Sequence, residues 1–207
     1  MLVPDNAMRQ LLAQRFKAYT EQFWQSEEAQ HYWVGRGLSV QMAKVFFVGF
    51  VSQPLRGDSR FINRLAIPYI TANNQPVSYK FRAIEETKKR YDKDKNDPSR
   101  IFNTRVLRSA RKVVVTEGEI DAIAATQCGL QAVGVPGANN WKPEWTRIFR
   151  NRLVTVLADG DEAGEEFADR VSSLLYGVRV VTMPQGEDTC SMLKEKGEEW
   201  IREMVVL

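Results

Sequence analysis

The sequence predicts an α/β protein with a mainly parallel sheet flanked by helices, preceded by a smaller α+β subdomain. Two apolar runs, residues 113–115 and 153–158, each end in carboxylates and glycine just before a helical pattern begins. A third apolar run, residues 178–183, ends in a similar acidic turn. Upstream, residues 64–70 and 76–84 read as two strands joined by a short turn, which favours a hairpin.

The N-terminal part is expected to be helical. Residues 7–24 carry their apolar side chains on one stripe, residues 27–36 suggest a second helix, and Ser39 is a suitable cap for a third helix that runs to Phe47. His31, the only histidine, lies in this region and away from the acidic residues. We expect a surface or packing role for His31, and histidine-based catalysis is not supported.

A polar, charged segment, residues 85–100, follows the hairpin. It suits a solvated, mobile loop, and it also suits a surface that contacts nucleic acid. The second interpretation depends on Lys88, Lys89 and Arg90, which cluster just before Tyr91, an aromatic residue able to stack on a base.

Charge divides the chain. Residues 80–112 hold 12 basic and 5 acidic side chains, a net charge of +7, whereas residues 113–207 hold 9 and 16, a net charge of −7. An acidic half beside a basic segment is typical of an enzyme that handles one phosphate with metal ions and others with lysine or arginine.

The first strand of the parallel part, residues 113–115, is continuously apolar, as expected of a strand that is covered on both faces. Glu117 stands where this strand stops. Residues 119–127 read as a helix, and residues 132–135 form a second short strand. Asp121 lies in the first turn of that helix, where it could support a metal site or simply complement the helix dipole.

The next strand, residues 153–158, ends at Asp159 and Asp161, and a helix begins at Glu162. Ligands of open parallel sheets bind beyond the carboxyl ends of the strands, so Glu117, Asp159 and Asp161 should converge there. Crowded carboxylates are costly to ionise together, and a hard divalent cation is the usual compensation. The cluster therefore predicts magnesium or manganese, although a strand-end aspartate can also be only a helix cap.

The chain closes with a strand at residues 178–183, a turn that contains Asp188 at the same edge of the sheet, and a helix at residues 189–204. Two cysteines, Cys128 and Cys190, without a CxxC pair exclude a sequence-visible disulfide framework or zinc finger, so no zinc is expected. No apolar run approaches the roughly 18 residues of a membrane span, and the N-terminus lacks the layout of a signal peptide. We expect a soluble intracellular protein with no membrane partner.

Four motifs resemble one family. EGEID (residues 117–121) and DGDEAG (residues 159–164) resemble the toprim signature shared by bacterial and phage DNA primases, type IA and II topoisomerases and some nucleases. MPQGEDTCSML (residues 183–193) resembles the primase version, in which a Gly-Glu-Asp segment adds metal ligands, and YWVGRGLSVQMAKVFFVGF (residues 32–50) resembles the segment that precedes the primase toprim domain. The resemblance covers roughly residues 30–195.

The resemblance implies the RNA polymerase core of a DNA primase: residues 1–110 form a basic α+β subdomain that contacts template and nucleotide, and residues 111–207 form the toprim catalytic domain. It implies synthesis of short RNA primers on single-stranded DNA in replication, with two or more Mg²⁺ or Mn²⁺ ions. The expected catalytic residues are Glu117, Asp159 and Asp161; the expected metal ligands are Glu117, Asp121, Asp159, Asp161 and Asp188; the expected nucleic-acid or nucleotide contacts are Arg82, Lys88, Lys89, Arg90 and Tyr91.

The implied partners are single-stranded DNA, ribonucleoside triphosphates, a replicative helicase and a separate zinc-binding primase module, because this sequence carries neither a helicase domain nor the zinc module. The implied location is the cytoplasm of a bacterial or phage-infected bacterial cell. Cys190 departs from the family pattern, which usually has a further aspartate there. A toprim nuclease would use the same acids but has no reason to carry residues 32–50. A non-catalytic nucleic-acid-binding relative also stays open, with Cys190 as its best argument.

Overall fold

The computed structural model of the 207-residue chain describes residues 4–136 and 141–206. The chain divides into two compact units: unit 1 comprises residues 1–35 and 39–98, and unit 2 comprises residues 36–38 and 99–207. This division differs from the predicted boundary between residues 110 and 111. Ile101, Leu107 and Ala110 are buried in the hydrophobic core of unit 2, so the connecting stretch belongs to the second unit.

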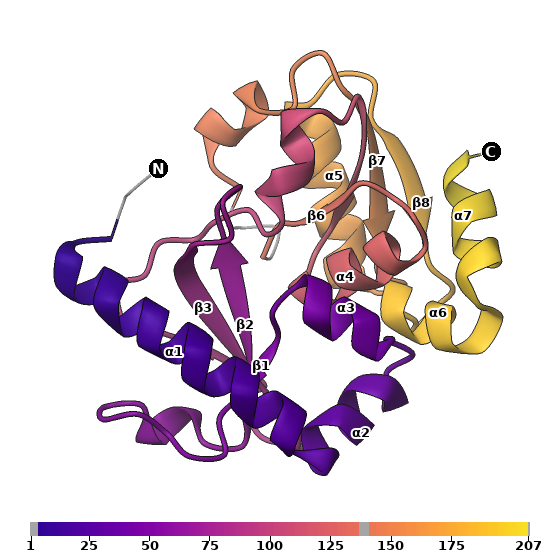
Figure 1. The fold of residues 1–207 in the computed structure, drawn as a ribbon. Helices are drawn as coiled ribbons and strands as arrows, with labels where there is room; N and C mark the ends of the chain where they lie inside the picture. The colour runs from indigo at the N-terminus through magenta and orange to yellow at the C-terminus, as the bar shows by residue number, and fades with distance from the viewer. Residues whose placement is uncertain (1–3, 137–140, 207) are drawn as a thin grey trace. The chain divides into compact units, whose positions relative to one another are not determined.

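Unit 1 is a four-stranded antiparallel sheet, in the order β1-β2-β3-β4, with helices packed on it. Its helices are α1 (Asn6–Gln25), α2 (Glu27–Gly35) and α3 (Val40–Val45), and its strands are β1 (Gly49–Phe50), β2 (Arg64–Ile70), β3 (Pro76–Ala83) and β4 (Tyr91–Lys93). Asp5 caps α1 by accepting a hydrogen bond from the backbone N–H of Met8. The helix then lies along the sheet (Figure 1) and buries Leu12 and Tyr19 against Phe81 and its neighbours.

The segment predicted as a loop, residues 85–100, contains the short strand β4, which pairs with β3. Arg64 also donates hydrogen bonds to the carbonyl oxygens of Lys89 and Arg90, at 3.0 and 3.3 Å. The segment is therefore built onto the sheet. Its high charge hid the strand, because alternation of polar and apolar residues is absent from it.

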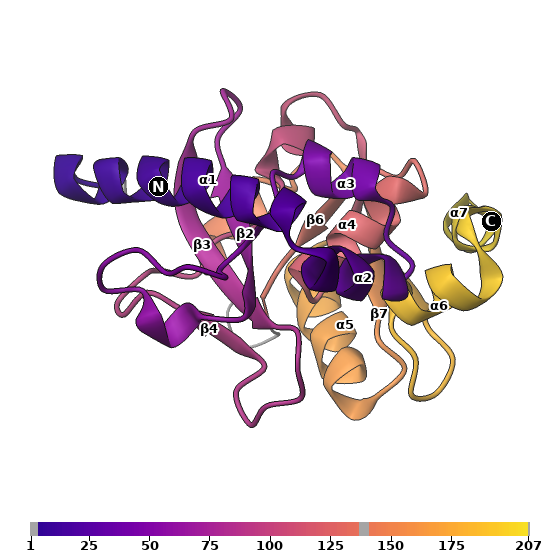
Figure 2. The same cartoon turned by 60° about the horizontal axis from the view of Figure 1, so that its bottom comes forward.

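Unit 2 is a four-stranded parallel sheet in the order β6-β5-β7-β8. Its strands are β5 (Lys112–Thr116), β6 (Ala132–Gly134), β7 (Leu153–Ala158) and β8 (Arg179–Thr182); its α-helices are α4 (Glu119–Gln127), α5 (Glu162–Leu174), α6 (Thr189–Lys196) and α7 (Glu198–Val206); and two short 3-10 helices are η2 (Thr104–Arg108) and η4 (Pro143–Arg147). Helices α4 and α5 cover opposite faces of this sheet (Figure 2). The predicted α/β class, with a parallel sheet flanked by helices, is confirmed.

The continuous apolar run of β5 is explained by these two covered faces. Val113 and Val115 lie in one core with Phe167 and Val171 of α5, and Val114 between them points to the opposite face and is also buried.

The predicted closing helix, residues 189–204, is wrong as a single element. The backbone turns at Gly197 (φ 87°), which ends α6, and α7 begins at the next residue. Within the described ranges, no helix is both long and apolar enough to cross a membrane.

Candidate active site

The order of the parallel strands creates a switch point between β5 and β7. From β5 the chain crosses through α4 to β6 on one side, and from β7 it crosses through α5 to β8 on the other side. Ligands of such sheets bind beyond the carboxyl ends of the strands at this point. Glu117 follows β5 and Asp159 follows β7, so both side chains belong to the switch point.

Backbone hydrogen bonds hold the two acidic turns of this edge together. The N–H of Gly160 donates to the carbonyl of Glu187 at 2.8 Å, and the N–H of Gly186 donates to the carbonyl of Gly160 at 2.7 Å. A Cβ atom on Gly160 would lie 1.9 Å from the carbonyl oxygen of Pro184, so only glycine fits between Asp159 and Asp161. The turn after β7 is thereby fixed against the turn that leads to Asp188.

Asp161 and Asp188 have capping roles besides their place at this edge. Asp161 caps α5 by accepting from the N–H of Gly164 at 2.8 Å, and a Cβ atom on Gly164 would lie 2.1 Å from the carbonyl oxygen of Asp159. Asp188 caps α6 by accepting from Ser191 at 2.6 Å, and its other carboxylate oxygen accepts from Arg36 at 3.1 Å. The capping interpretation and the ligand interpretation thus apply to the same two aspartates.

Two carboxylates at the switch point have raised pKa values, so without a bound cation they are partly protonated near neutral pH. Burial raises the pKa of Glu117 to about 7, and the charges of Asp161 and Asp121 add to that rise, while a backbone hydrogen bond from Asp159 opposes it. Burial raises the pKa of Asp159 to about 8, with further repulsion from Asp121, Glu117, Asp188 and Asp161. The five predicted acids therefore act on one another electrostatically.

Asp121 and Cys190 contact each other. Asp121, buried in the first turn of α4, accepts a hydrogen bond from the backbone N–H of Cys190 at 3.3 Å. The thiol of Cys190 is fully buried and donates to the carbonyl of Arg36 at 3.0 Å, and burial raises its pKa to about 12. Cys190 is thus a neutral thiol, and it offers no anionic ligand where the family pattern has an aspartate.

The donor set fits a hard divalent cation. Glu117 Oε1 and Asp159 Oδ1 are buried and accept no hydrogen bond within the described residues, so an oxygen on each is left for an ion. In those same ranges no three acidic, histidine or cysteine side chains already form a metal-binding group. Magnesium suits such a site, because it keeps several waters and takes only one or two carboxylates directly.

The predicted nucleic-acid residues belong to unit 1. Buried Arg82 donates from Nε to the hydroxyl of Tyr32 at 2.8 Å and from Nη1 to the hydroxyl of Tyr91. The Arg82 guanidinium lies 4.9 Å from the Tyr91 ring centroid, and the Lys80 ammonium lies 5.1 Å from it. The structure thus brings Arg82 and Tyr91 together with two residues that the sequence analysis did not select, Tyr32 and Lys80.

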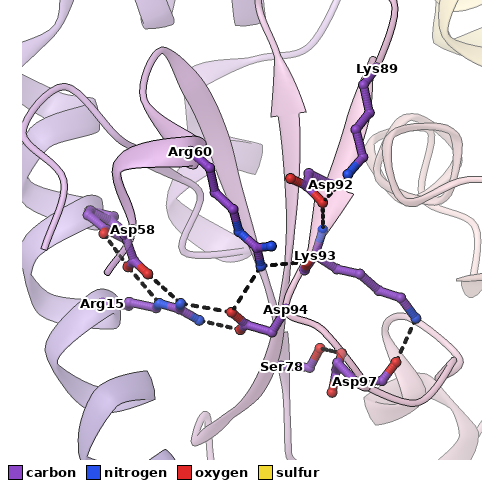
Figure 3. Close-up of polar contacts among 10 residues, drawn as sticks. Arg15, Asp58, Arg60, Ser78, Lys89, Asp92, Lys93, Asp94 and Asp97 are labelled. Atoms are coloured by element: carbon purple, nitrogen blue, oxygen red, sulfur yellow. Dashed lines mark hydrogen bonds and ion pairs between the residues drawn. The ribbon is translucent and has the colours of Figure 1, made fainter. Parts of the chain in front are cut away.

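The three consecutive basic residues, Lys88, Lys89 and Arg90, are exposed. Lys89 forms an ion pair of 2.7 Å with Asp92, a residue of β4 (Figure 3). That pair leaves Lys88 and Arg90 as the less engaged cations of the segment.

A buried ion-pair network holds the end of this segment in place. Arg15 of α1 pairs with Asp58 at 2.6 Å and with Asp94 at 2.5 Å, and Tyr19 donates to Asp58 at 2.5 Å (Figure 3 shows the two ion pairs). Arg60 adds a contact of 3.7 Å to Asp94. Asp94 directly follows β4, so the network fixes the strand that carries Tyr91.

Arg36 is a third residue that the sequence did not single out. It belongs to unit 2, where it pairs with Asp188. The sequence did contain a signal for both residues, because Tyr32 and Arg36 lie in the YWVGRGL stretch of the primase-like motif. That motif indicated the family but not the partners of its side chains.

With this geometry, comparison with known proteins defines the class. Residues 114–193 match the Toprim-like family. The DNA primase of Listeria monocytogenes serovar 1/2a is 27% identical over 191 residues, which are 82% of this chain and 30% of that protein. The chain belongs to the toprim-domain DNA primases of the bacterial and phage type.

One smaller relative matches along almost its whole length. The Gene 57 protein of Mycobacterium phage D29 is 41% identical over 147 residues, which are 68% of this chain and 97% of that protein. The chain spans about a third of the length of the curated DNA primases that it matches.

Solved structures show the same fold. The RNA polymerase domain of Mycobacterium tuberculosis primase DnaG superposes with a TM-score of 0.80 at 20% identity, over 98% of this chain and 84% of that one. A DnaG primase catalytic domain solved bound to ssDNA has a TM-score of 0.79 at 20% identity, over 97% of this chain and 80% of that one. The toprim fold expected from the motifs is confirmed.

Proposed function

We propose that this chain is the catalytic core of a DNA primase, which synthesises short RNA primers on single-stranded DNA in replication. The observation that carries the proposal is the pair of carboxylates Glu117 and Asp159 at the switch point of a toprim sheet. Their pKa values are raised, and each has a buried oxygen that accepts no hydrogen bond from the residues that the structure describes. Membership of the toprim primase family supports the same conclusion.

The acids would hold one or more Mg²⁺ or Mn²⁺ ions. Glu117, Asp159 and Asp161 supply the central oxygens, with Asp121 and Asp188 beside them. A bound divalent ion lowers the pKa of a primer 3′-hydroxyl and neutralises charge on the incoming triphosphate. Glu117 would act in this site either as a metal ligand or as the general base that takes the proton of that hydroxyl.

The cationic residues of unit 1 would hold template and ribonucleoside triphosphate. Lys88, Lys89 and Arg90 are exposed and consecutive, which suits contacts to successive phosphates. Arg82 is buried against Tyr32 and Tyr91, so it orients the Tyr91 ring as a stacking surface for a base. The related DnaG catalytic domain solved with ssDNA supports single-stranded DNA as the template.

Further partners follow from the relatives. The chain spans about a third of the curated primases, and we propose a replicative helicase and a separate zinc-binding primase module as its partners, as the resemblance implies. The phage relative supports a role in the cytoplasm of a phage-infected bacterial cell.

The direct test combines the purified chain with single-stranded DNA, labelled ribonucleoside triphosphates and Mn²⁺. We expect short labelled RNA from the parent and none from Asp159→Asn, with Glu166→Asn as an exposed acidic control that retains synthesis. A parallel reaction without nucleotides monitors the template. Degraded template with no RNA would favour a toprim nuclease, and neither product under any divalent ion would favour the non-catalytic alternative.

Sequence preference gives a second test. A zinc-binding primase module from the same source should raise the yield and restore a preferred starting sequence. Strong, sequence-selective initiation by the 207-residue chain alone would contradict the need for such a module.

A further inference from the structure

The edge of the unit 2 sheet opposite the carboxylates carries a basic surface. Strands β5 and β7 begin side by side there: Lys112 pairs in register with Leu153, and the N–H of Leu153 donates to the carbonyl of Arg111 at 2.8 Å. Figure 1 shows the segments around η2, before β7 and before β8 together at this end of the sheet. We call residues 104–112, 142–153 and 174–179 the amino-edge surface.

The amino-edge surface is strongly and asymmetrically charged. Its exposed cationic residues are Arg108, Arg111, Lys112, Arg147 and Arg150. Glu144 is the one acidic residue in its three segments. Across the described ranges, none of the five cationic side chains forms an ion pair or hydrogen bond, whereas Lys89, Lys196 and Arg202 each pair with a carboxylate. The charge is therefore available to an external anion.

A further arginine, Arg152, prearranges this surface. Arg152 points inward and donates to the carbonyl oxygens of Leu107 at 2.6 Å, of Ile148 at 3.0 Å and of Ala110. It thereby joins the segment that bears Arg108 to the segment that bears Arg150. Fixed cationic positions lose less conformational freedom when they bind, which favours a ligand with several charges.

An aromatic residue extends the surface. Tyr176 lies in the turn between α5 and β8, three residues before Arg179, and its side chain is fully exposed. An exposed tyrosine and exposed cations at one edge of a sheet suit single-stranded nucleic acid, because bases stack on the ring while cations follow the phosphates.

We propose that the amino-edge surface binds single-stranded nucleic acid at a site separate from the carboxylates. The six residues of β7 separate the two edges by about 20 Å, at roughly 3.3 Å per residue. That is several nucleotides of extended strand, so the surface contacts a part of the strand away from any reacting end. The proposal adds a second contact site and holds whether or not the acids catalyse RNA synthesis.

The test is the affinity of a fluorescently labelled 20-nucleotide oligo-dT, measured by anisotropy across a salt series without metal or nucleotides. The variant Arg108→Ala/Arg147→Ala/Arg150→Ala should lower the salt slope by about 2, at roughly 0.7 per phosphate contact, and weaken binding at least about tenfold in low salt. The control Lys194→Ala/Lys196→Ala/Arg202→Ala removes the same charge from α6 and α7 of the same unit. Equal losses in the two variants, or none in the first, would overturn the proposal.

Substitutions of Tyr176 distinguish binding of single-stranded nucleic acid from binding of other polyanions. Tyr176→Ala should weaken oligo-dT binding by about fivefold or more, whereas Tyr176→Phe should keep the parent affinity, because stacking needs the ring and not the hydroxyl. Binding of heparin should be insensitive to both changes. If Tyr176→Ala leaves oligo-dT affinity intact while the triple variant lowers it, the surface is a general polyanion site and the proposal is wrong.

All these side chains are exposed, and thermal melting verifies the fold of each variant. Arg150→Gln replaces the triple variant if that one does not fold.

Discussion

Replacing Glu117 by glutamine should stabilise the metal-free protein at alkaline pH. The change keeps the shape of the side chain and removes a charge that burial and neighbouring acids oppose. One pKa unit corresponds to about 1.4 kcal/mol, so a rise from 4.5 to about 7 limits the cost of ionising Glu117 to about 3 kcal/mol. Solvent reaches this half-buried carboxylate and screens the repulsion, so we expect about 1–2 kcal/mol, or about 4 °C in melting temperature for a chain of this size.

The direction of the pKa shift determines how the stability contributed by Glu117 changes with pH. The pKa of Glu117 is higher in the folded than in the unfolded protein, so its stabilising contribution is fully present below about pH 4.5 and is lost as the pH rises through about 7. Parent and Glu117→Gln should therefore melt at similar temperatures near pH 4.5 and diverge by pH 8.5, with the variant the more stable. Glu166→Gln, an exposed change on α5, should show no such divergence.

Magnesium provides the counter-test. A cation that binds the folded parent stabilises it by mass action, so millimolar Mg²⁺ at pH 8.5 should raise the melting temperature of the parent more than that of Glu117→Gln and close the gap between them. A variant that is less stable than the parent at pH 8.5, or one equally stabilised at both pH values, would refute the view that crowded carboxylates strain this edge.

Three further predictions follow from the contacts. Asp161→Asn should abolish metal-dependent activity with little loss of stability because asparagine still caps α5, whereas Asp161→Ala should lose about 1 kcal/mol as well; equal stability of the two variants in urea unfolding would exclude the capping role. Arg15→Ala should cost about 3–5 kcal/mol, because it leaves the buried carboxylate of Asp58 without a cation; a loss below about 1 kcal/mol in the same assay would contradict this. Alanine at Lys88, Lys89 and Arg90 together should reduce the salt slope of single-strand binding by up to about 2; parallel salt lines for variant and parent would mean that the segment makes no phosphate contact.

The parallel part of the fold could be predicted from sequence because a strand buried on both faces requires a continuous run of apolar residues. Val113 to Val115 is continuously apolar, and acids follow β5, β7 and β8 where each strand leaves the core. Strand β4 could not be predicted in this way. Its residues are Tyr91, Asp92 and Lys93, whose pairing with β3 comes from distant contacts such as the one between Asp94 and Arg15.

The candidate site shows the same division. The types and order of the acids predicted that they gather beyond the carboxyl ends of the strands. The spacing gave no sign that Asp188 pairs with Arg36 or that Cys190 contacts Asp121. Those contacts join residues 152 and 69 positions apart. A single sequence contains no local pattern that reports contacts of this kind.

The backbone hydrogen bonds of Gly160 with Glu187 and Gly186 bear on the design of an inactive variant of this protein. Main-chain atoms set the position of the acidic turns, so a change from acid to amide there alters charge while the architecture stays in place. Under the function proposed above, a chain inactivated in this way should still occupy single-stranded DNA and compete with an active copy. Such an inert competitor would report on DNA occupancy inside a cell separately from synthesis.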